Sequence, residues 1–379
     1  MNKRIFTFGL LVVLVSGIAF SQQFTLAVIP DIQSYTNHNA QKGVWGYPLN
    51  NMDMLMAQME YIRDNTVANG GTIAFAVQEG DLVDNRSMFS SEWRDASRAL
   101  MLMDGLIPYL VVPGNHDSDR WSRIDRSIPF QSVGWSTFKK YFGNESPHFK
   151  DKKWYGGSYN DGMDSWSILT VEGQRILFLA LELETPDDAL EWAQSVIDMH
   201  KGIPTVVITH EYLTVGARDR ENPEYLAFGN SRNRLYANGN SPETVWNKFI
   251  SKNDQIFMVL CGHSYLDNGE GEGIRIDVND YGHKVYAVLA NYQGRREIDN
   301  SIVTRRNLID SADGWFRLMH FDIAKSRVHV QTYSPYLDRY ETDADSDFTI
   351  NFDFDWKKRF PAINFQYVYS SLGKFLSSF

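Results

Sequence analysis

The sequence has one cysteine, Cys261, among its 379 residues. A disulfide bond within the chain is therefore excluded, and the fold must rely on a hydrophobic core, which a chain of this length can bury. Basic residues are also in the minority, with 37 Lys and Arg against 47 Asp and Glu. This acidic balance argues against broad binding of nucleic-acid phosphates, so no nucleic-acid partner is expected.

Long apolar runs are missing after the first twenty residues. The run Ile5–Phe20 follows Lys3 and Arg4, and small residues close it, so we predict a signal peptide over residues 1–21 with cleavage after Ser21. The alternative is a transmembrane anchor, but the run is shorter than the ~20 residues that span a bilayer. No later stretch is apolar enough to span a membrane. The mature protein is therefore expected to be secreted or periplasmic.

The remaining chain alternates between strand-like and helix-like patterns and then becomes rich in strands. We expect helices over 51–67, 91–103, 135–142, 187–199 and 242–251. We expect strands over 24–29, 73–77, 107–112, 166–171, 175–182, 205–209, 256–261, 274–278, 284–290, 316–323 and 328–333. Apart from its short helix, the region 118–165 is expected to be extended loop.

This order of elements predicts an α/β domain over residues 22–335 with a β-rich second half. Residues 336–379 are expected to form a C-terminal strand, near Phe348–Phe354, and a tail to which the sequence assigns no role.

Five of the expected strands end in polar clusters. Any one cluster resembles ordinary turn or helix-cap chemistry. Because ligands bind beyond the carboxyl ends of strands in an open α/β sheet, five clusters in this arrangement predict a single site. The clusters are Asp31-Ile32-Gln33, Gly80-Asp81-Leu82-Val83-Asp84, Gly114-Asn115-His116-Asp117, Thr209-His210-Glu211 and Gly262-His263-Ser264-Tyr265.

The residue types in these clusters favour metal ions. Asp, Asn and His supply the oxygen and nitrogen ligands that suit Zn, Mn or Fe, whereas a thiolate site would need more than one cysteine. Two ions ~3.5–4 Å apart need a shared carboxylate and can hold both oxygens of an in-line displacement. We therefore predict two divalent or trivalent ions, whose identity the sequence leaves open.

The blocks Gly80-Asp81-x-x-Asp84, Gly114-Asn115-His116-Asp117 and Gly262-His263, with the isolated His210 between them, resemble the calcineurin-like metallophosphoesterases. The resemblance covers about residues 24–335. It implies a four-layer α/β/β/α sandwich of two mixed sheets flanked by helices, which agrees with the expected order of strands.

The resemblance also implies the metal ligands. Asp81 would be shared by both ions, and Asn115, His210 and His263 would complete one ion site. Asp31 would bind the other ion.

His116 would lie beside the phosphate, where it would stabilise charge or protonate the leaving oxygen. Either Asp84 or Asp117 would orient its imidazole.

Two positions depart from the family pattern, and both belong to the second ion site. Gln33 stands where the family usually has His, and Tyr265 stands where a second His usually ends the Gly-His-x-His block. The Asp-x-Gln form resembles that of a secreted bacterial subgroup. This site is expected to be rebuilt from Asp31, Asp81 and either Gln33, through its carbonyl oxygen, or Tyr265, whose phenolate would favour a hard ion such as Fe(III).

The resemblance implies hydrolysis of phosphate mono- or diesters of a small phosphorylated substrate by a metal-activated water. One alternative is a catalytically impaired binding protein of the same fold, which Tyr265 favours and the intact His116 disfavours. The other is a metal-dependent hydrolase of another bond, such as an amide.

Loop arginines are candidate substrate contacts, and the oligomeric state is left open. These arginines are Arg218, Arg220, Arg232 and Arg234.

Overall fold

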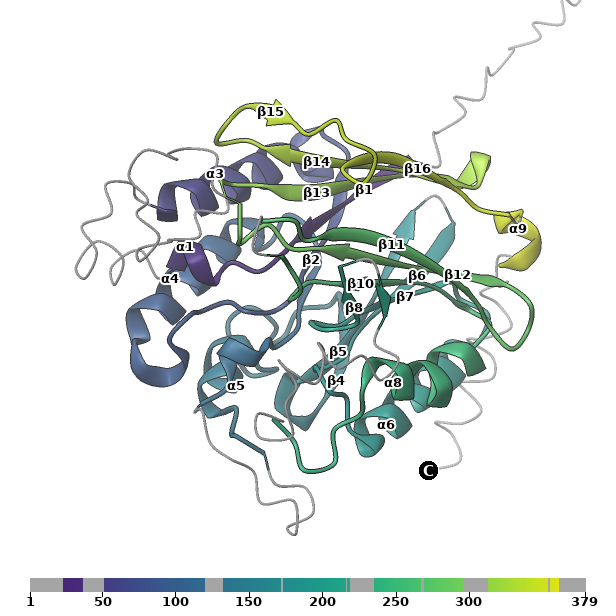
Figure 1. Ribbon diagram of the computed structural model, residues 1–379, viewed down its shortest axis with the longest axis horizontal. Helices are drawn as coiled ribbons and strands as arrows, with labels where there is room; N and C mark the ends of the chain where they lie inside the picture. Colours follow the sequence, from purple (N-terminus) through teal and green to yellow (C-terminus); the bar gives the residue numbers. More distant parts are fainter. Residues whose placement is uncertain are drawn as a thin grey trace, which may run out of the picture.

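Two mixed β-sheets lie face to face in the computed structural model, and helices cover their outer faces (Figure 1). The structure describes residues 23–36, 51–119, 132–171, 173–215, 217–218, 235–266, 269–295, 313–353 and 355–360. The predicted signal peptide and three of the four loop arginines (Arg220, Arg232 and Arg234) lie outside these ranges, as does the side chain of Arg218. Among the described residues, no helix has the length and apolar character needed to cross a membrane.

The first sheet has the order β15-β14-β13-β1-β2-β3, and β16 also pairs with β14. Its three strands β1, β2 and β3 run parallel, so their carboxyl ends share one edge. The strands are β1 (Gln23–Ile29), β2 (Ile73–Gln78), β3 (Tyr109–Val111), β13 (Phe316–Asp322), β14 (Arg327–Ser334), β15 (Arg339–Tyr340) and β16 (Asp347–Asn351).

The second sheet has the order β11-β12-β10-β7-β6-β5-β4. Here β6, β7, β10 and β12 run parallel, and the other pairings are antiparallel. The strands are β4 (Tyr155–Tyr159), β5 (Asp164–Val171), β6 (Gln174–Ala180), β7 (Thr205–Ile208), β10 (Ile256–Cys261), β11 (Glu272–Val278) and β12 (Lys284–Ala290). A separate short pair consists of β8 (Leu213–Thr214) and β9 (Ala217–Arg218).

The central strands are buried on both faces. In β1, Leu26 and Val28 face the other sheet, whereas Ala27 and Ile29 belong to the core beneath the helices. Between the sheets, the rings of Phe75 and Phe178 stack with centroids 4.0 Å apart. Alternating side chains thus join two cores along each central strand.

The helices form the two outer layers. Those on the first sheet are α1 (Gln33–Thr36), α3 (Asn51–Asp64), α4 (Ser90–Leu100) and α5 (Ser136–Phe142), and those on the second are α6 (Asp187–Met199) and α8 (Pro242–Lys248). The expected four-layer α/β/β/α sandwich is therefore confirmed.

Two segments differ from the expected order of elements. β4 lies in the region expected to be loop, where its sequence Tyr-Gly-Gly-Ser-Tyr has no apolar run. Strand β15 was not expected, whereas β16 overlaps the strand expected near Phe348–Phe354; both pair with β14, so they extend the first sheet beyond residue 335. The short helix α9 (Trp356–Arg359) follows, and Trp356 packs in the core between the sheets.

Candidate metal centre

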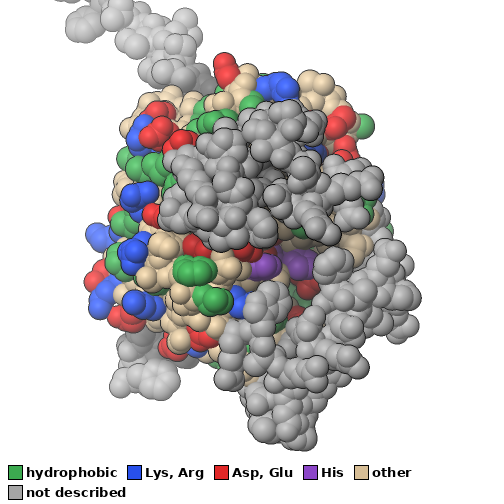
Figure 2. All heavy atoms as spheres, turned by 60° about the vertical axis from the view of Figure 1, so that its left-hand side comes forward, with side chains coloured by type: hydrophobic (Ala, Val, Ile, Leu, Met, Phe, Trp, Pro, Cys, Tyr) green, Lys and Arg blue, Asp and Glu red, His purple; other side chains and the backbone are tan. Residues whose placement is uncertain are grey.

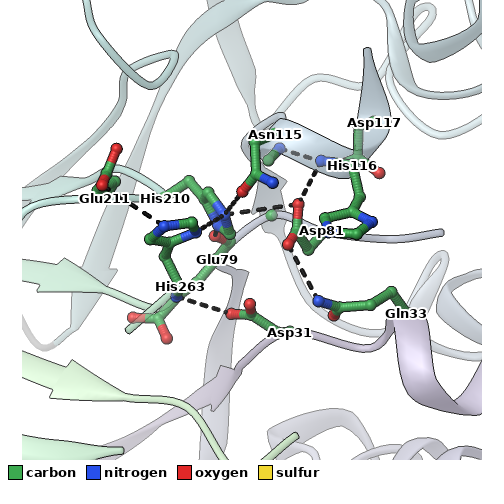
Figure 3. A network of polar contacts seen from close by, with 12 residues as sticks. Asp31, Gln33, Glu79, Asp81, Asn115, His116, Asp117, His210, Glu211 and His263 are labelled. Atoms are coloured by element: carbon green, nitrogen blue, oxygen red, sulfur yellow. Dashed lines mark hydrogen bonds and ion pairs between the residues drawn. The ribbon is translucent and has the colours of Figure 1, made fainter. Parts of the chain in front are cut away.

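The five polar clusters meet at one edge of the sandwich. They follow β1, β2, β3, β7 and β10, and Figure 3 shows one side chain of each, Asp31, Asp81, Asn115, His210 and His263, close together. Figure 2 shows histidine side chains reaching the surface of this face beside acidic groups. The parallel strands of each sheet therefore bring together residues that are far apart in the sequence.

Asp81 lies at the centre of this arrangement, and its two oxygens face different groups (Figure 3). Oδ1 accepts the backbone N–H of His116 at 2.8 Å and lies 3.5 Å from Nε2 of His210. Oδ2 accepts a hydrogen bond from Nε2 of Gln33 at 3.0 Å. The carboxylate is buried, and its position between two groups suits a ligand shared by two cations.

One of these groups, which we call the histidine pocket, consists of Asp81 Oδ1, Asn115, His210 and His263. His210 Nε2 lies 3.0 Å from Asn115 Oδ1 and 3.1 Å from His263 Nδ1. The backbone oxygen of Glu79 accepts from His210 Nδ1 at 2.7 Å, which directs Nε2 into the pocket.

The histidine pocket fits a metal ion. Ligand atoms of Asp81, His210 and His263 all lie within 4.8 Å of one another. Because oxygen and nitrogen lone pairs converge here, a cation can satisfy them together.

The charges of the two imidazoles differ. Burial disfavours the charged form of His210, but Asp81 and Asp31 outweigh it and raise the pKa of His210 to about 10. A metal cation at Nε2 would take the place of that proton beside the same carboxylates. Burial and the charge of His210 lower the pKa of His263 to about 3, so its imidazole is neutral and able to bind a metal at neutral pH.

The second group, which we call the amide pocket, consists of Asp81 Oδ2, Gln33 and Gln293. Gln33 Nε2 lies between Asp81 Oδ2 and the side-chain oxygen of Gln293, and it contacts both. Gln33 is buried, and its Oε1 has no hydrogen-bond partner among the described residues. The two oxygens thus converge on the amide nitrogen of Gln33, and the orphaned carbonyl oxygen is the other end of the same amide.

Asp31 is held beside the histidine pocket by His263 and Asn291. Its Oδ1 accepts the backbone N–H of His263 at 3.1 Å, and its Oδ2 accepts from Asn291 Nδ2 at 3.1 Å. Asn291 Nδ2 also donates to the backbone oxygen of His263 at 2.8 Å. Burial raises the pKa of Asp31 to about 7, and the nearby Asp81 contributes to the rise.

Gln293 and Asn291 are site residues that the sequence reasoning missed. They follow β12, which runs parallel to β10, so they form a sixth polar strand end at the same edge. Their sequence, Asn291-Tyr292-Gln293-Gly294, has the composition of an ordinary turn, and only the strand order could have indicated them.

His116 is held beside Asp81. Its Nδ1 lies 2.8 Å from the backbone oxygen of Asp84 and 3.4 Å from Asp84 Oδ1. Burial opposes protonation, but Asp81 and the hydrogen bonds to Asp84 outweigh it and raise the pKa of His116 to about 9. The imidazole is therefore oriented by Asp84 and can act as an acid.

Asp117 has a different position. Its Oδ1 accepts the backbone N–H groups of Leu82 at 2.8 Å and Val83 at 3.3 Å, and its Oδ2 accepts that of Gly114 at 2.8 Å. Of the two carboxylates proposed to orient His116, Asp84 contacts the imidazole and Asp117 fixes the backbone. Burial, together with the charge of Asp81, raises the pKa of Asp117 to about 8.

Tyr265 packs against the loop that carries Gln293. A Cβ placed on Gly294 would lie 2.5 Å from Cδ2 of the Tyr265 ring, so the ring covers this glycine directly. Metal ligation by Tyr265 stays a prediction.

Comparisons with known proteins place these residues in a family context. The family described as calcineurin-like phosphoesterase matches residues 24–267. The uncharacterized protein YvnB of Bacillus subtilis (strain 168) is 29% identical over 301 residues, a match that covers 76% of this chain and 19% of that protein. The chain thus spans less than a quarter of the length of this relative.

Two solved structures are also similar to the chain. Vacuolar protein sorting 29 from Cryptosporidium parvum shares 9% sequence identity with a TM-score of 0.29, and the match covers 86% of this chain and 96% of that one. A protein serine/threonine phosphatase from Saccharomyces cerevisiae, with similarity to human phosphatase PP5, shares 11% identity with a TM-score of 0.28, over 86% and 82% of the two chains.

Proposed function

The chain belongs to the calcineurin-like phosphoesterase family, and from this premise we propose that it is a secreted, metal-dependent hydrolase of small phosphate mono- or diesters. The observation that carries the proposal is the position of Asp81, with one oxygen toward the histidine pocket and the other toward Gln33. A carboxylate shared in this way suits two cations, and His116 stands next to it.

Cations held at these ligands would supply Lewis acidity toward a phosphoryl oxygen and would lower the pKa of a nearby water. Asp81, Asn115, His210 and His263 would hold one of them. The buried ligands are anchored to backbone groups, so they can keep their positions when a substrate binds.

We assign proton transfer to His116. Its Nδ1 faces the backbone oxygen and carboxylate of Asp84, so Nε2 is the ring atom that would donate the proton to the leaving oxygen of the substrate. Asp84 is a positioning residue in this scheme, because it contacts the imidazole and fixes its tautomer.

The test combines metal analysis with turnover of an aryl phosphate monoester and an aryl phosphate diester. We expect His116→Ala to lower kcat by ~10²–10⁴-fold while the metal content stays unchanged. His329→Ala is the matched control, because His329 also pairs with a carboxylate, Asp347, but lies on β14 away from the site. Full activity in His116→Ala would refute its role. A metal-loaded wild type that cleaves neither ester would favour the binding-protein alternative.

A further inference from the structure

The edges of the two sheets differ in length and regularity. β3 has three residues, β15 has two and β16 has five. β4 is interrupted by an irregularity between Tyr155 and Gly157. β11 is different, because it runs for seven residues in one continuous register with β12, its only strand partner among the described residues (Figure 1). A long and regular edge of this kind is a template for pairing with a further strand.

One face of β11 carries apolar side chains that are exposed. Ile274 lies opposite Val288 of β12, which belongs to the core between the sheets. Ile276 and Val278 lie on the same face, because side chains alternate along a strand. The exposed fractions are nevertheless 39% for Ile274, 51% for Ile276 and 59% for Val278. Single exposed apolar residues are ordinary, but a row of three along an open strand edge indicates a surface that another chain covers.

The same three residues direct their backbone groups to the open edge. The backbone N–H of Asn279 donates to the backbone oxygen of His283, so Asn279 and every second residue before it bond with β12. The residues between them, Ile274, Ile276 and Val278, therefore point their N–H and C=O groups away from β12. A strand added at this edge would pair with these three residues.

The charges on the other face of β11 fit a second copy of the same strand. Arg275 Nε lies 2.9 Å from Asp277 Oδ2 on that face. In an antiparallel pair of two β11 strands centred on Ile276, Arg275 of each copy is opposite Asp277 of the other, which is favourable. A pair centred on Arg275 would place two guanidinium groups opposite each other, and a pair centred on Asp277 would do the same with two carboxylates. A pair centred on Ile274 would place Arg275 opposite Gly273, which has no side chain. Charge complementarity therefore selects the register centred on Ile276.

We propose that two copies of the chain associate through β11, in an antiparallel pair with a twofold axis at Ile276. The second sheets of the two copies then form one continuous sheet. About six backbone hydrogen bonds join the two strands, two at each of the three residue pairs. Ile274 of each copy packs against Val278 of the other, and the two Ile276 side chains meet at the axis. Each favourable contact away from the axis occurs twice, because the same surface is used by both copies.

Sedimentation velocity of the purified protein, over about 1–50 μM, measures the association. The wild type should become dimeric within this range. Ile276→Lys places two ammonium groups at the axis and should stay monomeric throughout. Because the Ile276 side chain is exposed, the circular dichroism spectrum and the Tm of this variant should match the wild type. Val67→Lys is the matched control and should still dimerise, since Val67 is 52% exposed but lies in a turn before β2 of the first sheet.

Charge variants test the pairing between copies. Arg275→Asp gives a strand with two acidic groups, and Asp277→Arg gives a strand with two basic groups, so each variant alone should be monomeric. Mixed in equal amounts, the two variants should form a heterodimer, because every acidic group is then opposite a basic group. The pair within the strand stays broken in both variants, so restored association reports charge pairing between the copies.

Cysteine variants test the register. The single cysteine of the chain, Cys261, is buried, so an added thiol can be oxidised selectively. Ile276→Cys is opposite itself across the axis, at a Cα separation that a disulfide bond spans, and should give a covalent dimer. In Val278→Cys the two Cα atoms would lie about 14 Å apart, so this variant should not form a covalent dimer.

Three results would overturn the inference. They are a wild type that stays monomeric over the whole concentration range, an Ile276→Lys variant that dimerises like the wild type, and equal cross-linking of the two cysteine variants. A mixture of the two charge variants that stays monomeric would refute the register centred on Ile276 in the same way.

Discussion

Removal of the Asp117 carboxylate should destabilise the fold strongly, although this group does not contact His116. Asp117 is fully buried and accepts three backbone N–H groups, from Leu82, Val83 and Gly114. In Asp117→Ala, each buried N–H that loses its partner costs about 1–3 kcal/mol. The longer bond to Val83, at 3.3 Å, contributes least.

Part of this loss is offset. Burial of the carboxyl group is itself unfavourable, which is why the pKa of Asp117 rises to about 8, and alanine removes that penalty. We therefore expect a net loss of about 2–5 kcal/mol in the free energy of unfolding. Urea unfolding followed by circular dichroism measures this loss, with the slope of the transition expected to stay unchanged.

Asp119→Ala is a close control. The Asp119 carboxylate also accepts three hydrogen bonds, from the backbone and hydroxyl of Ser136 at 2.8 Å each and from the backbone of Thr137 at 3.0 Å. It is more exposed, so water can replace the lost acceptor and the expected loss is about 0.5–1.5 kcal/mol. Equal destabilisation by the two substitutions would refute the argument that burial of these backbone groups sets the penalty.

Three further outcomes are expected. Asp81→Asn should lower both metal content and turnover, because it weakens the shared ligand; full metal occupancy would contradict that role. Tyr265→His should change the metal content if position 265 supplies a ligand, and unchanged content would exclude it. Burial raises the pKa of Asp164 from 3.8 to about 7, so its contribution to stability is complete below about pH 4 and is lost as the pH rises through 7. Asp164→Asn should therefore flatten the decline in Tm over this range, and an unchanged slope would show that Asp164 is not the cause.

Parts of the fold follow closely from local sequence. Helix α6 has the expected bounds because acidic residues occupy its first turn and apolar residues recur at helical spacing behind them. The sequence did not predict β4, because the residues of this strand are determined by packing against Trp166 on the neighbouring strand β5. A Cβ on Gly156 would lie 2.1 Å from Cζ3 of Trp166, so the indole ring on β5 requires glycine where a strand would otherwise favour larger side chains.

Some residues of the candidate site can likewise be predicted from local sequence, and others cannot. Residues such as Asp81 and His263 stand in short motifs at the ends of apolar strands, so the sequence alone indicates them. Gln293 could not be found in this way, because its relevance depends on β12 lying beside β10 in the second sheet. Strand order is a property of the whole domain and leaves no local pattern.

Steric crowding requires glycine at these motif positions, and this requirement is independent of catalysis. A Cβ on Gly80 would lie 2.7 Å from Nδ1 of His210, and one on Gly262 would lie 2.3 Å from Oδ1 of Asp31. The residues that follow, Asp81 and His263, have positive φ angles of 53° and 70°, a conformation that costs about 1–3 kcal/mol for a non-glycine residue.

A binding protein with this site would need the same glycines and the same strained backbone as an enzyme. The motifs therefore establish where the ligands stand and do not by themselves establish turnover. His116 is different, because its imidazole is 24% exposed and its ring contacts Asp84 without completing the buried ligand group. Since the imidazole of His116 is not one of the ligands of the histidine pocket, substitution of His116 separates catalysis from the structural requirements of the metal site.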